Sequence, residues 1–194
     1  MDIKNIFIIS GPSGAGEDSI INELKKRMNV RTIVTTTTRD MRSGESEGKP
    51  YYFVSIKKFK NLIKEDGFVE WAQQYNGQYY GVTKQEFADI VAEGKIGLWK
   101  IEYKGVQTAK KKFPHIIAIL IMAESLDVLE KRIRNRSKVT EEYVQERMKY
   151  TKEWLKHTDV YDYHVINRQN KLFEAVEEVE NIIKKHIENN EKPC

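Results

Sequence analysis

A glycine-rich segment near the N-terminus has the composition of a phosphate-binding turn. The residues GPSGAGEDS at positions 11–19 follow the apolar run 6–9 and precede an amphipathic segment. Between a strand and a helix, glycines allow backbone N–H groups to surround a phosphate, and the usual pattern G-x-x-x-x-G-K-[ST] adds a lysine and a hydroxyl. Here Glu17 and Asp18 hold the last two positions, so the turn lacks the expected base.

The two acids allow two interpretations. Negative charge at a helix N-terminus is favourable by about 0.3–1 kcal/mol, so Glu17 and Asp18 could serve only as helix-capping acids in an inactive nucleotide site. Alternatively, the missing cation lies elsewhere in the chain and the site still binds phosphate. Ser19 is a poor substitute for the missing hydroxyl, because one step along a helix turns the side chain by about 100°.

Composition narrows the class of protein. A chain of 194 residues is expected to form one domain, and its net charge of +4 is too small to indicate a nucleic-acid or membrane partner. The single cysteine, Cys194, excludes an intrachain disulfide and favours a reducing compartment, so we expect a cytoplasmic protein. The longest apolar runs are too short to span a membrane. A monomer or a homodimer is expected.

The elements that must position the turn alternate between strands and helices, which predicts a parallel sheet. Segment 35–94 differs from the rest because it consists of short tyrosine-rich pieces, and we interpret it as an inserted substrate lobe. Within it, Thr83 and Glu86 have the spacing of a helix capping box. Ser125 and Thr140 are expected to cap two further helices. The remaining predicted elements are strands at 6–9, 96–101, 116–122 and 165–167, and helices at 20–28, 104–112 and 172–183.

A longer motif follows the glycine turn. The sequence TTTTRDMRSGESEGKPYYFV at 35–54 closely resembles the T-T-R-x-x-R-x-G-E-x-x-G-x-x-Y-x-F-V pattern of the guanylate kinase family. The resemblance continues in FVEWA at 68–72, in NGQYYGVT at 76–83 and in VIN at 165–167, so it covers nearly the whole chain. It implies a P-loop three-layer α/β fold with a parallel central sheet, an inserted GMP-binding lobe and a helical lid.

The resemblance also implies an acceptor site for GMP. Two guanidinium groups, Arg39 and Arg42, could hold its phosphate through bidentate hydrogen bonds. Guanine presents two hydrogen-bond donors that adenine lacks, and carboxylates are suitable acceptors for them. The residues implied for GMP are Thr35, Arg39, Arg42, Glu45, Tyr51, Glu70, Tyr80, Thr83 and Glu102.

On the donor side the resemblance implies ATP with Mg²⁺ and a lid that carries arginines. A second departure from the family pattern occurs at GLWKIEYKG, 97–105, where Lys100 replaces an expected aspartate. We therefore expect Glu17 and Lys100 to be an exchanged charge pair, and Asp18 is a candidate Mg²⁺ ligand. The residues implied for ATP and its phosphates are Gly11, Pro12, Ser13, Gly14, Ala15, Gly16, Glu17, Asp18, Ser19 and Asn167, and those implied for catalysis are Lys100, Arg132, Arg136 and Arg147.

These expectations divide the single domain 1–194 into a core (1–34, 95–124 and 149–190), a GMP-binding lobe (35–94) and a lid (125–148). Three functions remain open. The first is phosphoryl transfer from ATP to GMP with an altered phosphate loop. The second is a binding module for GMP or a phosphorylated partner that has lost transfer. The third is a kinase for another phosphorylated small molecule, against which Glu70 and Glu102 argue.

Overall fold

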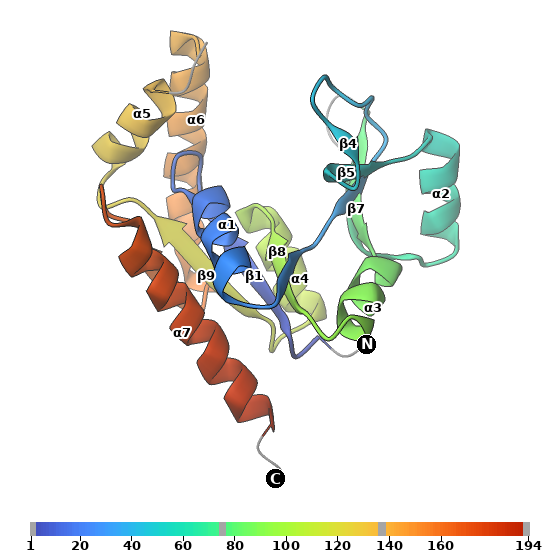
Figure 1. Cartoon of the computed structure of the whole chain (residues 1–194). Coiled ribbons are helices and arrows are strands. Elements are labelled where there is room, and N and C mark those ends of the chain that lie inside the picture. The colour runs from blue at the N-terminus through green and yellow to red at the C-terminus, as the bar shows by residue number, and fades with distance from the viewer. Residues whose placement is uncertain (1–2, 74–76, 136–138, 192–194) are drawn as a thin grey trace.

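The computed structural model, which describes residues 3–73, 77–135 and 139–191, is a mixed α/β structure built on a five-stranded parallel sheet (Figure 1). The strands of this core sheet lie in the order β10-β9-β1-β8-β2. The expected fold class, α/β with a parallel central sheet, is confirmed. The core strands are β1 (Ile6–Ser10), β2 (Val30–Thr32), β8 (Ile96–Lys100), β9 (Ile117–Met122) and β10 (Tyr163–Ile166).

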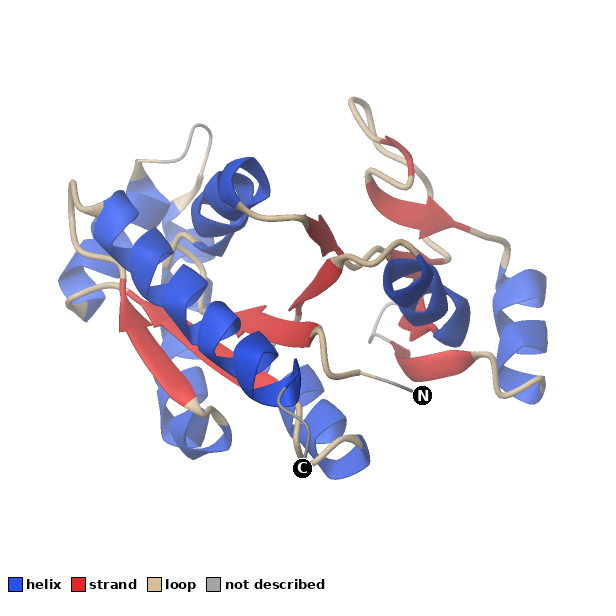
Figure 2. Ribbon diagram, turned by 60° about the horizontal axis from the view of Figure 1, so that its bottom comes forward, coloured by secondary structure: helices blue, strands red, loops and turns tan. Residues whose placement is uncertain are grey.

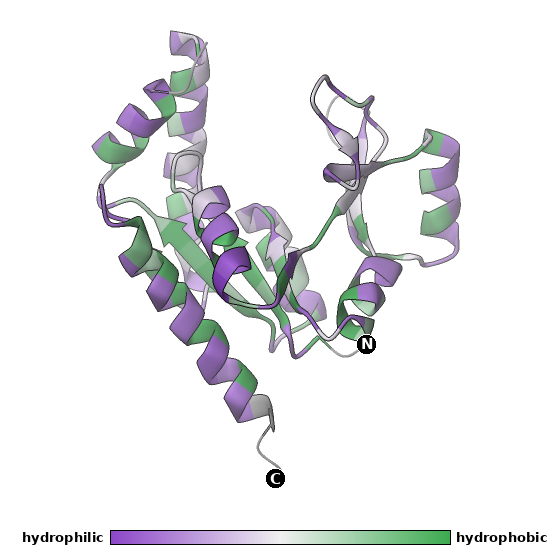
Figure 3. Ribbon diagram, viewed as in Figure 1, coloured by the Kyte–Doolittle hydropathy of each residue, from purple (hydrophilic) through white to green (hydrophobic). Residues whose placement is uncertain are grey.

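Helices cover both faces of the core sheet because its strands are apolar on both faces (Figures 2 and 3). Phe7 and Ile9 of β1 belong to one buried cluster, and Ile6 and Ile8 belong to another. The first cluster includes residues of α1 (Glu17–Arg27), α5 (Leu126–Arg134) and α7 (Leu172–Glu191). The second includes residues of α3 (Lys84–Ala92), α4 (Tyr103–Lys112) and α6 (Glu141–Trp154), which continues into the 3-10 helix η1 (Leu155–Val160).

A second, mixed sheet lies in the chain between β2 and β8 and stands beside the core in Figure 1. Its strand order is β4-β5-β3-β7-β6. Phe59 of α2 stacks on Phe68 at 4.3 Å between ring centroids and approaches Tyr79 at 5.3 Å, which gives this lobe an aromatic core of its own. Its elements are β3 (Thr35–Thr37), β4 (Ser46–Glu47), β5 (Pro50–Phe53), α2 (Ile56–Lys64), β6 (Phe68–Gln73) and β7 (Tyr79–Thr83).

Three helices begin at the caps that the sequence predicts. The hydroxyls of Ser125, Thr140 and Thr83 each accept a hydrogen bond from the backbone N–H three residues later. Of the two hydrogen bonds in the capping box predicted from Thr83 and Glu86, however, only the one from the Glu86 N–H to the Thr83 hydroxyl forms. The Glu86 carboxylate accepts the N–H of Val34 instead of returning to Thr83, because a buried position between the lobe and the core offers it stronger donors.

A buried hydrogen-bond network fixes the ends of β1 and β8 beside each other. The Ser10 hydroxyl donates to the Ile101 carbonyl at 2.6 Å and lies 2.9 Å from the Tyr161 hydroxyl. The indole N–H of Trp154 donates to the same Tyr161 oxygen at 3.0 Å. Since the glycine turn follows Ser10 directly, this network places it next to the residues that end β8.

We predict that Tyr161→Phe destabilises the fold by about 1–3 kcal/mol, because it leaves the buried indole N–H of Trp154 without its partner and removes one of the two hydrogen bonds of Ser10. The free energy of unfolding in urea measures the effect. Tyr143→Phe is the control, since the described residues include no hydrogen-bond partner for its hydroxyl, and it should change stability by less than about 0.5 kcal/mol. Equal stability of the two variants would contradict the role assigned to the network.

Candidate active site

The turn between β1 and α1 requires glycine at the positions where it approaches other segments. Gly16 has φ 99°, and a Cβ atom there would lie 2.4 Å from Nδ2 of Asn167. A Cβ atom on Gly11 would lie 2.5 Å from the Ile121 carbonyl oxygen. Asn167 donates from Nδ2 to the Ala15 carbonyl at 2.8 Å, so the structure brings this predicted residue to the turn.

Glu17 turns its carboxyl group back toward the turn. A Cβ atom on Gly11 would lie 3.3 Å from Cδ of Glu17. Burial raises the pKa of Glu17 to about 7, although the backbone N–H groups of Glu17 and Gly16 and the charge of Lys100 favour its ionised form. A carboxyl group thus faces backbone N–H groups of the kind that bind phosphate in related turns.

Lys100 forms an ion pair with Asp18, at 2.6 Å between Nζ and Oδ1, and not with Glu17. The expected Glu17–Lys100 pair is therefore wrong in its partner. The reason is geometric: Glu17 points into the turn, and Asp18, about 100° further around the helix, points toward the end of β8. The side chains of Lys100 and Asp18 are 44% and 75% exposed, so the pair contributes only about 0–1 kcal/mol to stability.

A cavity of about 300 Å³ brings together three groups of predicted residues. The turn contributes Glu17, the lobe contributes Tyr51, and the helix α6 contributes Arg147. The full lining is Gly11, Ser13, Glu17, Tyr51, Lys100, Ile101, Glu102, Arg147, Tyr150 and Trp154. Segments far apart in the chain thus meet at the carboxyl ends of β1 and β8, where ligands usually bind in open parallel sheets.

The α6 side of this cavity includes residues that the sequence analysis missed. Tyr150 donates a hydrogen bond to Oε2 of Glu102 at 2.7 Å, and burial together with this bond raises the pKa of Tyr150. Arg147 lies over the ring of Tyr143 at 5.0 Å, and its buried Nε has no hydrogen-bond partner within the described residues. The spacing of Arg147, Tyr150 and Trp154, three and then four residues apart, could have indicated one helical face.

In the lobe, Glu45 orients Arg39. Arg39 donates from its two terminal nitrogens to the two Glu45 oxygens at 2.7 and 2.5 Å. These hydrogen bonds, followed by one from the Arg42 backbone N–H, lower the pKa of Glu45 to about 2. The Arg39 guanidinium also lies over Tyr51, 4.9 Å from the ring centroid, and Tyr51 contacts the ring of Tyr80 at 6.0 Å.

The residues expected to face guanine are distributed over the lobe and its border with the core. Glu70 on β6 is half-buried, has no hydrogen-bond partner in the described parts of the chain, and has a pKa that burial raises to about 7. The Thr83 hydroxyl accepts the Glu86 N–H as a helix cap. Thr35 lines a larger cavity, of about 790 Å³, which lies between α1 and the lobe and also includes Asp18 and Lys100.

Arg132 of α5 also reaches the turn. It donates from Nη2 to the Asn167 carbonyl at 2.9 Å and from Nη1 to the Gly14 carbonyl at 3.4 Å. Together with Ser19 and Asn167 it lines a third cavity, of about 310 Å³. Ser19 and Glu17 therefore face different cavities. Arg136, the other arginine expected on this helix, lies outside the described residues.

The described residues contain no group of three or more acidic, histidine or cysteine side chains that could hold a metal ion. Asp18, the predicted Mg²⁺ ligand, therefore belongs to no such group among the described residues. Its exposed carboxylate forms an ion pair with Lys100. Among the helices of the described residues, none is long and apolar enough to cross a membrane.

Comparisons with known proteins agree with this geometry. Residues 3–186 match the family model for guanylate kinase. The chain is 40% identical over 171 residues to a guanylate kinase of Rickettsia prowazekii, covering 86% of each chain. It is 36% identical over 179 residues to one of Carboxydothermus hydrogenoformans, covering 92% of this chain and 86% of the relative.

A solved structure is similar as well. The crystal structure of a guanylate kinase from Anaplasma phagocytophilum matches with a TM-score of 0.69 and 28% sequence identity, over 93% of this chain and 84% of that one. The family model covers nearly the full length of the chain, including Glu17, Asp18 and Lys100. The chain belongs to the guanylate kinase family.

Proposed function

We propose that this protein transfers a phosphoryl group from ATP to GMP, giving ADP and GDP. The observation that carries the proposal is the cavity of about 300 Å³ in which Glu17 of the turn, Tyr51 of the lobe and Arg147 of α6 meet. Phosphoryl transfer requires aligned phosphates and positive charge more than covalent chemistry, and Lys100 and Arg147 in the lining of this cavity supply positive charge. Membership of the guanylate kinase family supports the same reaction.

On the acceptor side, Arg39 and Arg42 would bind the GMP phosphate with the hydroxyls of Tyr51 and Tyr80. Glu45 prepares Arg39 for this role, because a bidentate ion pair fixes the guanidinium plane. Glu70 and Glu102 would accept the guanine donors, with Thr35 and Thr83 beside them. Within the described residues the carboxylate of Glu70 has no hydrogen-bond partner, which supports this assignment, since a half-buried acceptor gains most from a ligand that supplies donors.

On the donor side, the turn at 11–19, Asn167 and Arg132 would hold the ATP phosphates. Arg147 and Lys100 would stabilise the charge that spreads over the transferred group, together with Arg136. Lys100 can leave its weak, exposed pair with Asp18 at little cost. Protonated Glu17 would not repel phosphate, and its pKa of about 7 makes that form available near neutral pH.

Mg²⁺ would arrive with the phosphates of ATP and neutralise part of their charge. A magnesium ion of this kind needs only one or two protein carboxylates. Asp18 fits this requirement, since its carboxylate is exposed and its one ion-pair partner within the described chain is Lys100.

A second function is favoured by one observation. Because the Glu17 carboxyl group lies against the turn, ATP can bind only if it displaces this group or if the group has taken up a proton from solvent. A module that binds GMP or a phosphorylated partner without transfer would result if ATP cannot do so. Titration calorimetry separates the two functions, since the module binds GMP alone and the kinase binds both nucleotides.

We predict GDP formation from ATP, GMP and Mg²⁺, and a fall of about 10²–10³-fold in kcat for Lys100→Ala, the typical loss when one group that stabilises transition-state charge is removed. Steady-state kinetics measures both. Lys111→Ala, an exposed lysine of α4, is the control and should match the parent protein. Folded protein without GDP formation above background would overturn the proposed reaction.

We predict that ATP affinity falls as the pH rises, because Glu17 ionises with a pKa of about 7 and then repels phosphate. Between pH 6 and 8 its ionised fraction rises from about a tenth to about nine-tenths, so the dissociation constant for ATP should increase about tenfold. Glu17→Gln should remove this dependence, and Glu23→Gln on the same helix should keep it. Parallel pH profiles of the parent and Glu17→Gln would exclude the effect.

We predict the opposite trend for GMP. Its guanine donors need ionised Glu70, whose pKa is also about 7, so GMP affinity should increase about tenfold from pH 6 to pH 8. In Glu70→Gln the affinity should be lower at pH 8 and nearly independent of pH. Calorimetry on both proteins, with Glu65→Gln as an exposed control, measures the difference, and an unchanged profile in Glu70→Gln would refute the assignment.

A further inference from the structure

The chain passes twice between the core sheet and the lobe. The first crossing, 33–34, joins β2 to β3, and the second, between Thr83 and Lys84, joins β7 to α3. The helix α3 itself is attached to the core, since Phe87 packs edge-on against Trp99 of β8 at 5.2 Å between ring centroids. Any change in the angle between lobe and core has to bend these two crossings.

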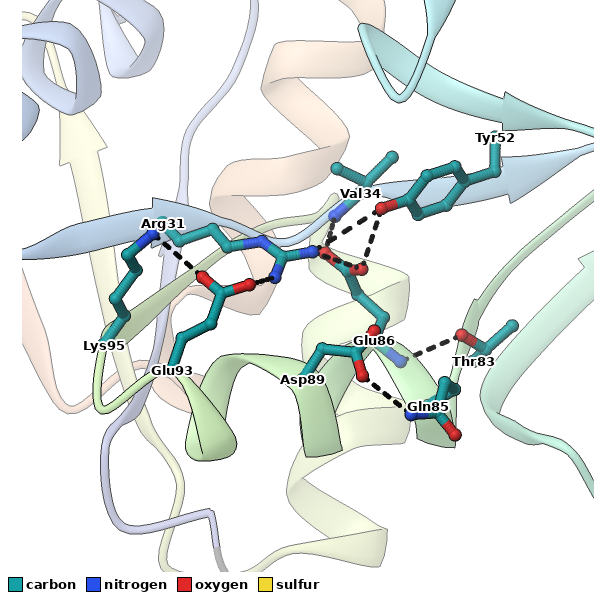
Figure 4. Close-up of polar contacts among 9 residues, drawn as sticks. All are labelled: Arg31, Val34, Tyr52, Thr83, Gln85, Glu86, Asp89, Glu93 and Lys95. Carbon is teal, nitrogen blue, oxygen red and sulfur yellow. Dashed lines mark hydrogen bonds and ion pairs between the residues drawn. The ribbon is translucent and has the colours of Figure 1, made fainter.

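A buried carboxylate lies at the first crossing (Figure 4). Glu86, 2% exposed, projects from α3 and accepts the Val34 N–H at 2.9 Å. Its other oxygen accepts Nη2 of Arg31 at 2.9 Å and the Tyr52 hydroxyl at 3.3 Å. Arg31 and Glu86 belong to core-attached elements and Tyr52 belongs to the lobe strand β5, so the carboxylate connects the two parts.

The same group also ties the end of α3 to the core. Arg31 donates from Nη1 to Glu93 at 2.5 Å, and Glu93 pairs with Lys95 at 2.8 Å. Arg31 therefore contacts one acid on α3 and one directly after it, so one connected set of charges holds α3 to the core strand β2 beside the first crossing. We call Arg31, Val34, Tyr52 and Glu86 the hinge cluster.

We propose that Glu86 is a positioning residue that sets the angle of the lobe and thereby the GMP affinity of the site. Arg31, Val34 and Tyr52 line the cavity of about 790 Å³ between α1 and the lobe, so the hinge cluster lies beside the space that a change of angle would open or close. Tyr51, next to Tyr52, lines the cavity assigned to phosphoryl transfer. The inference about GMP rests on the proposed function, but the angle does not.

Chemistry explains why the position needs a carboxylate. Three donors converge on Glu86, and an ionised carboxylate has acceptors only. In Glu86→Gln the amide oxygen can still accept the Val34 N–H, but its NH₂ group would then face Arg31, which has no acceptor, and the Tyr52 hydroxyl would have to accept instead of donate. This variant therefore removes the ion pair with Arg31 and reverses the hydrogen bond to the lobe, while it preserves the side-chain volume.

The test measures the distance between lobe and core, which changes with the angle between them. Spin labels are attached at Lys57→Cys on α2 and at Lys185→Cys on α7, in a Cys194→Ser background. Double electron–electron resonance then reports the distance between the lobe and the core. We expect a broader or shifted distance distribution for Glu86→Gln and a smaller change in the same direction for Tyr52→Phe. Asp89→Asn, whose carboxylate pairs with Gln85 on the same helix, should match the parent.

GMP titration on the same proteins tests the consequence. If the competent angle falls to about a tenth of the population, the dissociation constant for GMP rises about tenfold, with little change for ATP. A distance distribution in Glu86→Gln and in Tyr52→Phe identical to that of Asp89→Asn would overturn the proposal. A changed distribution with no GMP binding in any variant would support the hinge and count against the proposed function.

Discussion

The close approach of the glycine turn to the ends of β9 and β10 is the constraint on which the site depends. Gly11 leaves no room for a Cβ atom against the Ile121 carbonyl, and Gly16 leaves none against Asn167. This contact fixes Asn167, and Asn167 and Gly14 in turn offer the carbonyls that Arg132 binds. The position of α1, and with it the direction of Glu17 and Asp18, follows from the same turn.

The first turn of α1 places two carboxyl groups, those of Glu17 and Asp18, in two different environments. Glu17 enters the half-buried turn and acquires a high pKa, whereas Asp18 stays in solvent and pairs with Lys100. The parallel register between β1 and β8, which aligns Ile9 with Lys100, puts that lysine at the correct end of the sheet. Backbone pairing therefore sets the place of this cation, which we propose replaces the one that the turn lacks.

Local features of the sequence predicted much of this structure. The apolar runs of β1, β8 and β9 and the hydroxyl caps at Ser125 and Thr140 depend on near neighbours in the chain, and the family motif indicated the lobe. The partner of Lys100 was not predictable, because it depends on how far one side chain rotates around α1. The contact of Glu86 with Val34 was missed for a related reason: a local capping pattern competed with a buried donor more than 50 residues away.

Three cations near the site are each held by an acid, and burial distinguishes their roles. Arg39 is only 10% exposed and is fixed by Glu45 through two hydrogen bonds, so it can bind a phosphate only as a preoriented group. Arg31 pairs with a carboxylate that is 2% exposed, and releasing it would leave a buried charge unpaired. Lys100 has the weakest such restraint, because its partner is largely in solvent. Of these three, it is the cation that a polyphosphate can redirect at the lowest cost, which is what the proposed donor site, without a lysine in its turn, requires.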